Sequence, residues 1–198
     1  MFSGIVEETG KVVSIDRNKE NIDLTIACSF VDKLKVDQSV AHNGVCLTVV
    51  RKTDSTYTVT AIQETLIKSN LGDLVPGSEV NLERSMTMDK LLDGHMVQGH
   101  VDQTAICTKV EEADGSWYYT FLYDSSKGNI TVEKGSISVD GVSLTVVNSK
   151  DDSFQVAIIP YTYEHTVFHN YKEGTRVNLE FDIIGKYITK IMKQQMGK

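Results

Sequence analysis

The sequence predicts an all-β fold made of two homologous halves and followed by one C-terminal helix. Three observations support this prediction: an internal repeat, many short runs of β-branched and aromatic residues, and one tail segment with helical spacing of its apolar residues. Turn-forming residues recur roughly every 8–12 residues, the spacing typical of β-sandwiches and barrels.

The repeat is the strongest of the three observations. Residues 39–50 (SVAHNGVCLTVV) align with residues 136–147 (SISVDGVSLTVV), with seven of twelve positions identical at an offset of 97. Two further pairs match in the same order: GSEVNLE (77–83) with GTRVNLE (174–180), and MFSGIV (1–6) with MVQGHV (96–101). We therefore expect a first domain over 1–95, a second over 96–182, and a helix over 183–198.

Each half contains runs typical of strands, such as VCLTVV, YTVTAI, SLTVV, FQVAII and RVNLEF. Asn43-Gly44 and Asp140-Gly141 predict tight turns just before the strongest strand of each half. Helical spacing is scarce, and KLLDG (90–94) is a short candidate at the junction of the halves.

The tail is a stronger helix candidate, because its apolar residues follow i, i+3, i+4, i+7 spacing: Ile184, Tyr187, Ile188 and Ile191, continued by Gln195. An amphipathic helix at the end of a β protein needs a partner for its apolar stripe. Docking on its own barrel and self-association both remain open.

Composition excludes several classes of protein. Lys and Arg number 20 against 27 Asp and Glu, a formal net charge of −7, which argues against a nucleic-acid-binding surface. No run approaches the ~18 apolar residues of a membrane span, and the first ten residues do not resemble a signal peptide. The three cysteines leave one over in any disulfide pairing, which indicates a reducing compartment. We expect a cytoplasmic protein.

The common catalytic and phosphate-binding motifs are absent from the sequence. His95 and His100 bracket HMVQGH, but their spacing places them on opposite faces of a strand and no third ligand is near in sequence, so no metal site is expected. Three hydroxyl-bearing residues of the first half have counterparts in the second, and they could be turn caps or site residues: Ser39/Ser136, Thr48/Thr145 and Thr65/Thr162. Cys46 could be a small buried apolar residue or a site residue.

Several long motifs resemble the riboflavin synthase family: MFSGIVEE, SVAHNGVCLTV, ETL with NLGDL, GHMVQGHVD and DGVSLTV. The resemblance covers essentially the whole chain. It implies two tandem Greek-key six-stranded β-barrels with a C-terminal α-helix. It also implies the dismutation of two 6,7-dimethyl-8-ribityllumazine molecules to riboflavin and 5-amino-6-ribitylaminouracil, without metal or organic cofactor.

The resemblance also implies site residues. Its first pocket corresponds to Gly4, Ile5, Val6, Cys46, Leu47, Thr48, Thr60, Ala61, Ile62, Gln63, Glu64 and Thr65. Its second corresponds to Gly99, His100, Val101, Lys134, Ser143, Leu144, Thr145, Ile159, Pro160, Tyr161, Thr162, Tyr163 and Glu164. Ser39, Cys46, His100 and Phe2 match positions with catalytic roles in the family. Tyr161 and Tyr163 depart from the family pattern, because they stand where the first half has Glu64 and Leu66.

The family further implies a homotrimer held by C-terminal helices, with half-sites of neighbouring subunits facing each other, and association with lumazine synthase. Two alternative functions share the fold. A lumazine-binding antenna protein is expected to lose polar site residues in one half, whereas here Ser39, Cys46, His100, Lys134 and Thr145 are present. A flavoprotein oxidoreductase needs a nicotinamide-binding domain for which the chain has no room.

Overall fold

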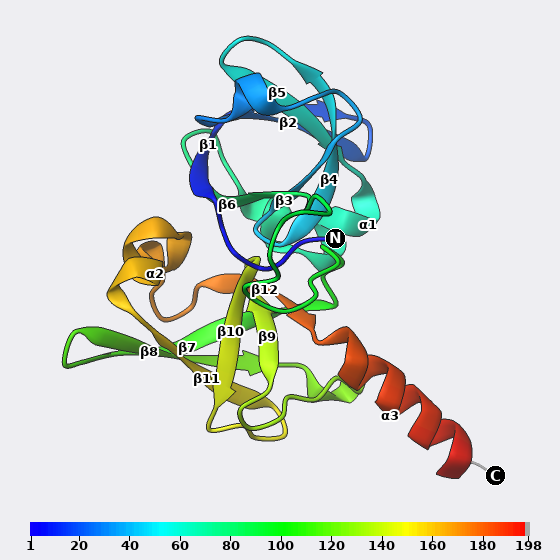
Figure 1. The fold of residues 1–198 in the computed structure, drawn as a ribbon, viewed down its shortest axis with the longest axis vertical. Helices are drawn as coiled ribbons and strands as arrows, with labels where there is room; N and C mark the ends of the chain where they lie inside the picture. Colours follow the sequence, from blue (N-terminus) through cyan, green and yellow to red (C-terminus); the bar gives the residue numbers. More distant parts are fainter. Residues whose placement is uncertain (197–198) are drawn as a thin grey trace.

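The computed structural model describes residues 1–196 and contains two closed six-stranded antiparallel barrels, one from each half of the chain (Figure 1). The first barrel has the strand order β1-β2-β5-β4-β3-β6. Its strands are β1 (Glu8–Asn18), β2 (Asn21–Ala27), β3 (Ser39–His42), β4 (Val45–Lys52), β5 (Thr56–Ala61) and β6 (Glu79–Arg84). β2 pairs with β5 rather than with β3, the next strand along the chain, which gives the Greek-key order.

The second barrel repeats this arrangement, in the order β10-β11-β8-β7-β12-β9. Its strands are β7 (Gln103–Ala113), β8 (Ser116–Tyr123), β9 (Ser136–Val139), β10 (Val142–Val147), β11 (Ser153–Ile158) and β12 (Arg176–Phe181). Both predicted turns are confirmed, since Asn43, Gly44, Asp140 and Gly141 all have positive φ, between 44° and 82°, as a type I′ turn requires. The predicted pair of barrels is therefore confirmed.

Each barrel encloses its own core. Aliphatic side chains such as Leu24, Ile26 and Val59 dominate the first core, whereas Tyr119, Phe121 and Phe154 fill much of the second. His42 belongs to the first core, where its Nε2 lies 2.8 Å from the Tyr57 hydroxyl. Burial lowers the pKa of His42 to about 4, so this histidine is a neutral core residue.

Two pairs of short helical segments, at equivalent positions in the two halves, were not predicted. α1 (Gln63–Lys68) and η2 (Asn70–Asp73) follow β5, and α2 (Pro160–His165) with η4 (Val167–Asn170) follow β11; η1 (Val31–Lys33) and η3 (Ser125–Lys127) are single turns. Six residues are too few to show a helical period in the sequence. The prediction of a helix at 90–94 is wrong, because that segment is irregular. Its two leucines, Leu91 and Leu92, are 74% and 49% exposed, so the segment buries no apolar face that would stabilise a helix.

The C-terminal helix is confirmed as α3 (Ile183–Met196), while residues 197–198 lie outside the described part of the chain. It extends away from the second barrel (Figure 1). Its apolar stripe does not dock on the barrel, because Ile184, Ile188 and Ile191 are each more than half exposed. A groove of about 750 Å³ runs between α3 and residues 128–136. Within residues 1–196 no helix is long and apolar enough to cross a membrane.

Candidate active site

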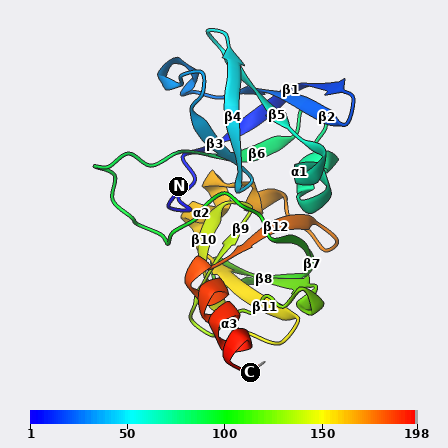
Figure 2. The same cartoon turned by 90° about the vertical axis from the view of Figure 1, so that its right-hand side faces the viewer.

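Two short arms cross between the barrels. The first arm is residues 1–6 and the second is residues 96–101; they meet where Phe2 and Val97 form an antiparallel bridge, with N–H to O distances of 2.7 and 3.1 Å. The N-terminus accordingly lies between the two barrels (Figure 2). Because Phe2 and Val97 are equivalent positions of the repeat, the bridge relates the two halves by an approximate twofold axis.

Each arm forms part of the wall of the opposite barrel. The Gly4 carbonyl accepts a hydrogen bond from the Ser143 N–H at 2.7 Å, and the Gly99 carbonyl accepts one from the Cys46 N–H at 2.9 Å. Val6 packs against the second core, and Val101 packs against the first.

This arrangement corrects the expected grouping of site residues. Gly4, Ile5 and Val6 were expected beside Cys46, and Gly99, His100 and Val101 beside Ser143. The structure exchanges the two triplets, because the Phe2–Val97 bridge directs each arm onto the other half of the chain. We call the surroundings of Cys46 the Cys46 pocket and the surroundings of Ser143 the Ser143 pocket.

Only glycine fits at the two crossing points. Gly4 and Gly99 have φ of +75° and +83°. A Cβ on Gly4 would lie 2.6 Å from the Ser143 Cβ, and one on Gly99 would lie 2.5 Å from the Cys46 Cβ. Both the backbone conformation and the close approach therefore require the absence of a side chain.

The Cys46 pocket begins on the β3–β4 hairpin. Ser39 is the cross-strand partner of Thr48, and Ala41 is that of Cys46. Phe2 is fully buried and packs with Ala41, Val97 and the half-buried Cys46. Phe2 thus lies beneath Cys46 rather than in an open cavity.

The other wall of the Cys46 pocket is the end of β5 and the helix that follows. Pairing of Val49 with Val59 brings the start of β4 and the end of β5 to the same edge of the barrel. Ile62, Gln63 and Glu64 are exposed there, and Glu64 is paired with Lys68 at 2.7 Å. The Thr60 hydroxyl donates to Asp23 at 2.7 Å. The side chains of Leu47 and Ala61 are buried in the core, so only their backbone atoms face this edge.

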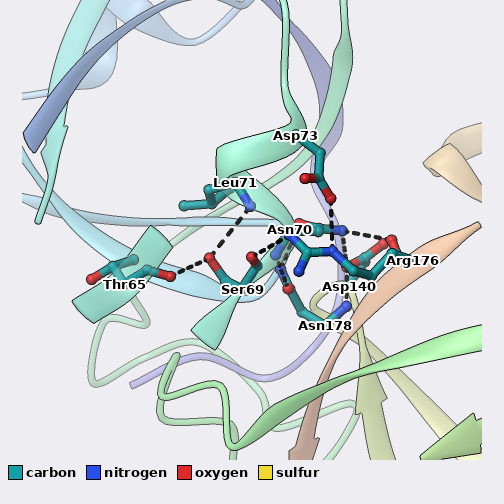
Figure 3. Close-up of polar contacts among 8 residues, drawn as sticks. All are labelled: Thr65, Ser69, Asn70, Leu71, Asp73, Asp140, Arg176 and Asn178. Atoms are coloured by element: carbon teal, nitrogen blue, oxygen red, sulfur yellow. Dashed lines mark hydrogen bonds and ion pairs between the residues drawn. The ribbon is translucent and has the colours of Figure 1, made fainter. Parts of the chain in front are cut away.

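The helix α1 is also tied to the second barrel (Figure 3). The Thr65 carbonyl accepts from the Ser69 hydroxyl at 2.6 Å, and Ser69 in turn accepts at its own carbonyl from Arg176 at 2.9 Å. Asn70 donates its N–H to the Asn178 side chain at 2.6 Å and its amide NH₂ to Asp140 at 3.0 Å. The position of this pocket wall therefore depends on contacts between the barrels.

The Ser143 pocket contains His95, for which the sequence suggested only a possible role as a metal ligand. The ring nitrogen Nδ1 of His95 lies 2.6 Å from the Ser143 hydroxyl. The backbone N–H of His95 donates to the Ser3 carbonyl at 3.2 Å. Burial lowers the pKa of His95 below its usual value, which favours the neutral imidazole, a base. No group of three or more potential metal ligands occurs within residues 1–196.

Aromatic side chains border the Ser143 pocket. Trp117 stacks on Tyr163 with ring centroids 3.9 Å apart, and Tyr161 stacks on His165 at 4.1 Å. The remaining residues expected here are mostly exposed: Thr145, Ile159, Pro160 and Glu164 near this edge, with Leu144 and Thr162 partly buried. Lys134 is also exposed but lies beside the far end of β10, where its N–H donates to the Val146 carbonyl at 2.9 Å. His100, expected in this pocket, is exposed on the arm that contacts Cys46.

Comparison with known proteins identifies the family. The Lumazine binding domain family matches residues 3–85 and 98–182. Riboflavin synthase of Bacillus subtilis (strain 168) is 42% identical over 193 residues, covering 97% of this chain and 90% of the relative. That of Mycobacterium bovis is 42% identical over 198 residues, covering 98% of both chains. The chain belongs to the riboflavin synthase family.

Solved structures agree with the fold. LumP complexed with 6,7-dimethyl-8-(1'-D-ribityl) lumazine superposes with a TM-score of 0.83 at 21% identity, covering 91% of this chain and 98% of that chain. LumP complexed with riboflavin gives a TM-score of 0.84 at 22% identity. The two-barrel fold of these structures thus covers 91% of this chain.

Proposed function

We propose that this chain catalyses the riboflavin synthase reaction, the last step of riboflavin biosynthesis. Two molecules of 6,7-dimethyl-8-ribityllumazine react, and one transfers a four-carbon unit to the other. The products are one riboflavin and one 5-amino-6-(D-ribitylamino)uracil. The observation that carries this proposal is the 42% identity to riboflavin synthases over almost the entire chain.

The duplicated architecture suits a reaction between two identical substrates. Each half supplies a pocket at the corresponding edge of its barrel, one at Cys46 and one at Ser143. Holding two reactants in a productive orientation can lower a bimolecular barrier by up to about 7–11 kcal/mol. Positioning can therefore provide much of the catalysis without a cofactor.

Proton removal from the C7 methyl group of one lumazine is assigned to the Ser143 pocket. The neutral imidazole of His95, 2.6 Å from the Ser143 hydroxyl, can accept a proton through that hydroxyl. Ser39, Cys46 and His100 are proposed to act at the other lumazine, and Phe2 to support Cys46 from below. The exposed residues of both edges are proposed to bind the ring and the ribityl chain.

A homotrimer is proposed as the working assembly. The exposed apolar stripe of α3 favours self-association over docking on its own barrel, since Ile184, Ile188 and Ile191 face solvent. A trimer would set the Cys46 pocket of one subunit against the Ser143 pocket of the next. A cytoplasmic location remains a prediction from the three cysteines, and association with lumazine synthase remains one from the family.

Incubation of the purified chain with the lumazine alone tests the proposed function. We expect riboflavin fluorescence to rise, with the pyrimidine formed in equal amount and no effect of a chelator. Tight binding of the lumazine without product would instead indicate a chromophore-binding protein. A requirement for an added metal or cofactor would contradict the proposed reaction scheme.

A further inference from the structure

Two buried glutamates occupy equivalent positions on the last strands of the two barrels. Glu83 lies on β6 and Glu180 on β12, and each is 3% exposed. The proposed reaction leaves both carboxylates without a role.

Each carboxylate accepts hydrogen bonds from backbone N–H groups of the arm that leads into the first strand of its own barrel. Glu180 accepts from the N–H groups of Gln98, Gly99 and His100, at 2.6, 2.9 and 2.9 Å. Glu83 accepts from the N–H groups of Ser3 and Gly4, at 2.8 and 3.0 Å, and from the Ser3 hydroxyl at 2.8 Å. Each set of donors converges on its own buried carboxylate, so each arm is fixed at the turn just before it crosses.

The arms carry this restraint into the opposite barrel. The Gly99 carbonyl, directly next to the N–H groups held by Glu180, is the acceptor for Cys46 of the first barrel. The Gly4 carbonyl, next to the N–H groups held by Glu83, is the acceptor for Ser143 of the second barrel. A glutamate of one barrel is thus connected, through one arm, to the wall of the pocket in the other.

We propose that Glu180 and Glu83 are positioning residues that act crosswise: Glu180 sets Gly99 and His100 against Cys46, and Glu83 sets Gly4 and Ile5 against Ser143. The inference rests on the proposed function only in treating these two pockets as substrate sites. The crosswise control itself is a property of the fold and can be measured without substrate.

Burial raises the pKa of both carboxyls, while the bound N–H groups oppose that shift. The amides need a carboxylate with both oxygens free to accept. Glu180→Gln and Glu83→Gln therefore keep the shape of the side chain but turn one acceptor into a donor that faces other donors.

Amide hydrogen exchange of the full-length variants tests the proposal. In Glu180→Gln we expect the Cys46 N–H to exchange at least about tenfold faster, with the Ser143 N–H unchanged, and the reverse in Glu83→Gln. Asp140→Asn is the control, because it also removes a buried carboxylate between the barrels but contacts neither arm. Equal loss at both amides in each variant, or no loss at either, would overturn the proposal.

Two further measurements keep the test decisive. If a Gln variant does not fold, Glu180→Asp and Glu83→Asp retain the charge with a shorter reach, and we expect a weaker loss of protection at the same amide. Lumazine titration of each variant should show one weakened and one retained site per chain, whereas general destabilisation would weaken both sites. Crosswise exchange without lumazine turnover would leave this inference intact and refute only the proposed function.

Discussion

The N–H of Cys46 donates to the carbonyl of Gly99 at 2.9 Å, although the two residues belong to different halves of the chain. The equivalent bond joins Ser143 to Gly4 at 2.7 Å. Neither pocket is therefore complete within one half. A substitution in one arm should alter the backbone contact that this arm makes with the opposite barrel.

Substitution of Gly99 by Ala tests this contact. A non-glycine residue at positive φ costs about 1 kcal/mol or more, and overpacking against Cys46 adds about 1–3 kcal/mol. Gly174→Ala is a matched control, since Gly174 has φ +89° but no atom within 4 Å of its Cβ position. We expect denaturant unfolding to show a larger loss for Gly99→Ala than for Gly174→Ala. Equal losses would mean that the close approach does not matter.

The hydrogen bond between His95 and Ser143 leads to a second prediction. His95→Gln should lower kcat at least tenfold, or about 1.4 kcal/mol in activation free energy, with little change in stability. Because burial lowers the pKa of His95 from its reference value of 6.5, the acidic limb of the kcat profile should lie below pH 6.5.

His169→Gln provides the control for that experiment. His169 is a partly exposed histidine whose ring lies edge-on to that of Tyr163, with centroids 6.3 Å apart, but its ring nitrogens contact the Thr166 carbonyl and Glu79 rather than Ser143. Its substitution should leave kcat within about twofold of the original value. An unchanged kcat in His95→Gln would remove His95 from the mechanism.

The repeat was sufficient to predict two equivalent β halves, because motifs such as Asn43-Gly44 and Asp140-Gly141 recur in order and predict equivalent hairpins. The closed barrels were implied by the resemblance to the riboflavin synthase family. The sequence was not sufficient to predict which barrel each arm joins. Gly4 and Gly99 stand at equivalent positions, so the alignment is the same whether the arms stay or cross. His95 was noticed for its spacing to His100, yet its partner Ser143 lies 48 residues away and only the fold brings them together.

A third prediction concerns assembly through α3. Ile188→Asp places a charge in the middle of the exposed apolar stripe, and burying such an isoleucine contributes roughly 1.5–3 kcal/mol per subunit. We expect sedimentation to show monomers with intact barrels and reduced turnover. Lys190→Asp, an exposed position on the opposite side of the same helix, should leave the assembly unchanged. A persistent trimer in Ile188→Asp would place the interface elsewhere.

The last prediction follows from Asp140, a fully buried carboxyl between the barrels. It accepts hydrogen bonds from the Asn70 NH₂ group, the Asn178 N–H and the Tyr171 hydroxyl. Burial outweighs these bonds and raises the pKa of Asp140 to about 7, from a reference value of 3.8. The folded state then binds more protons than the unfolded state between about pH 4 and 7, so this group makes stability fall as pH rises through that window.

Asp140→Asn should remove this dependence. Asn43, the equivalent residue of the first half, shows that an amide fits, since its side-chain oxygen accepts the Asn81 N–H at 2.8 Å. The free energy of unfolding of the variant, relative to the original chain, should therefore increase from pH 5 to pH 7 by up to about 1.4 kcal/mol per pH unit. Urea unfolding at several pH values measures this difference in the free energy of unfolding. Both proteins share every other titrating group, so the difference reports on Asp140 alone. A difference that stays constant with pH would show that Asp140 is ionised throughout.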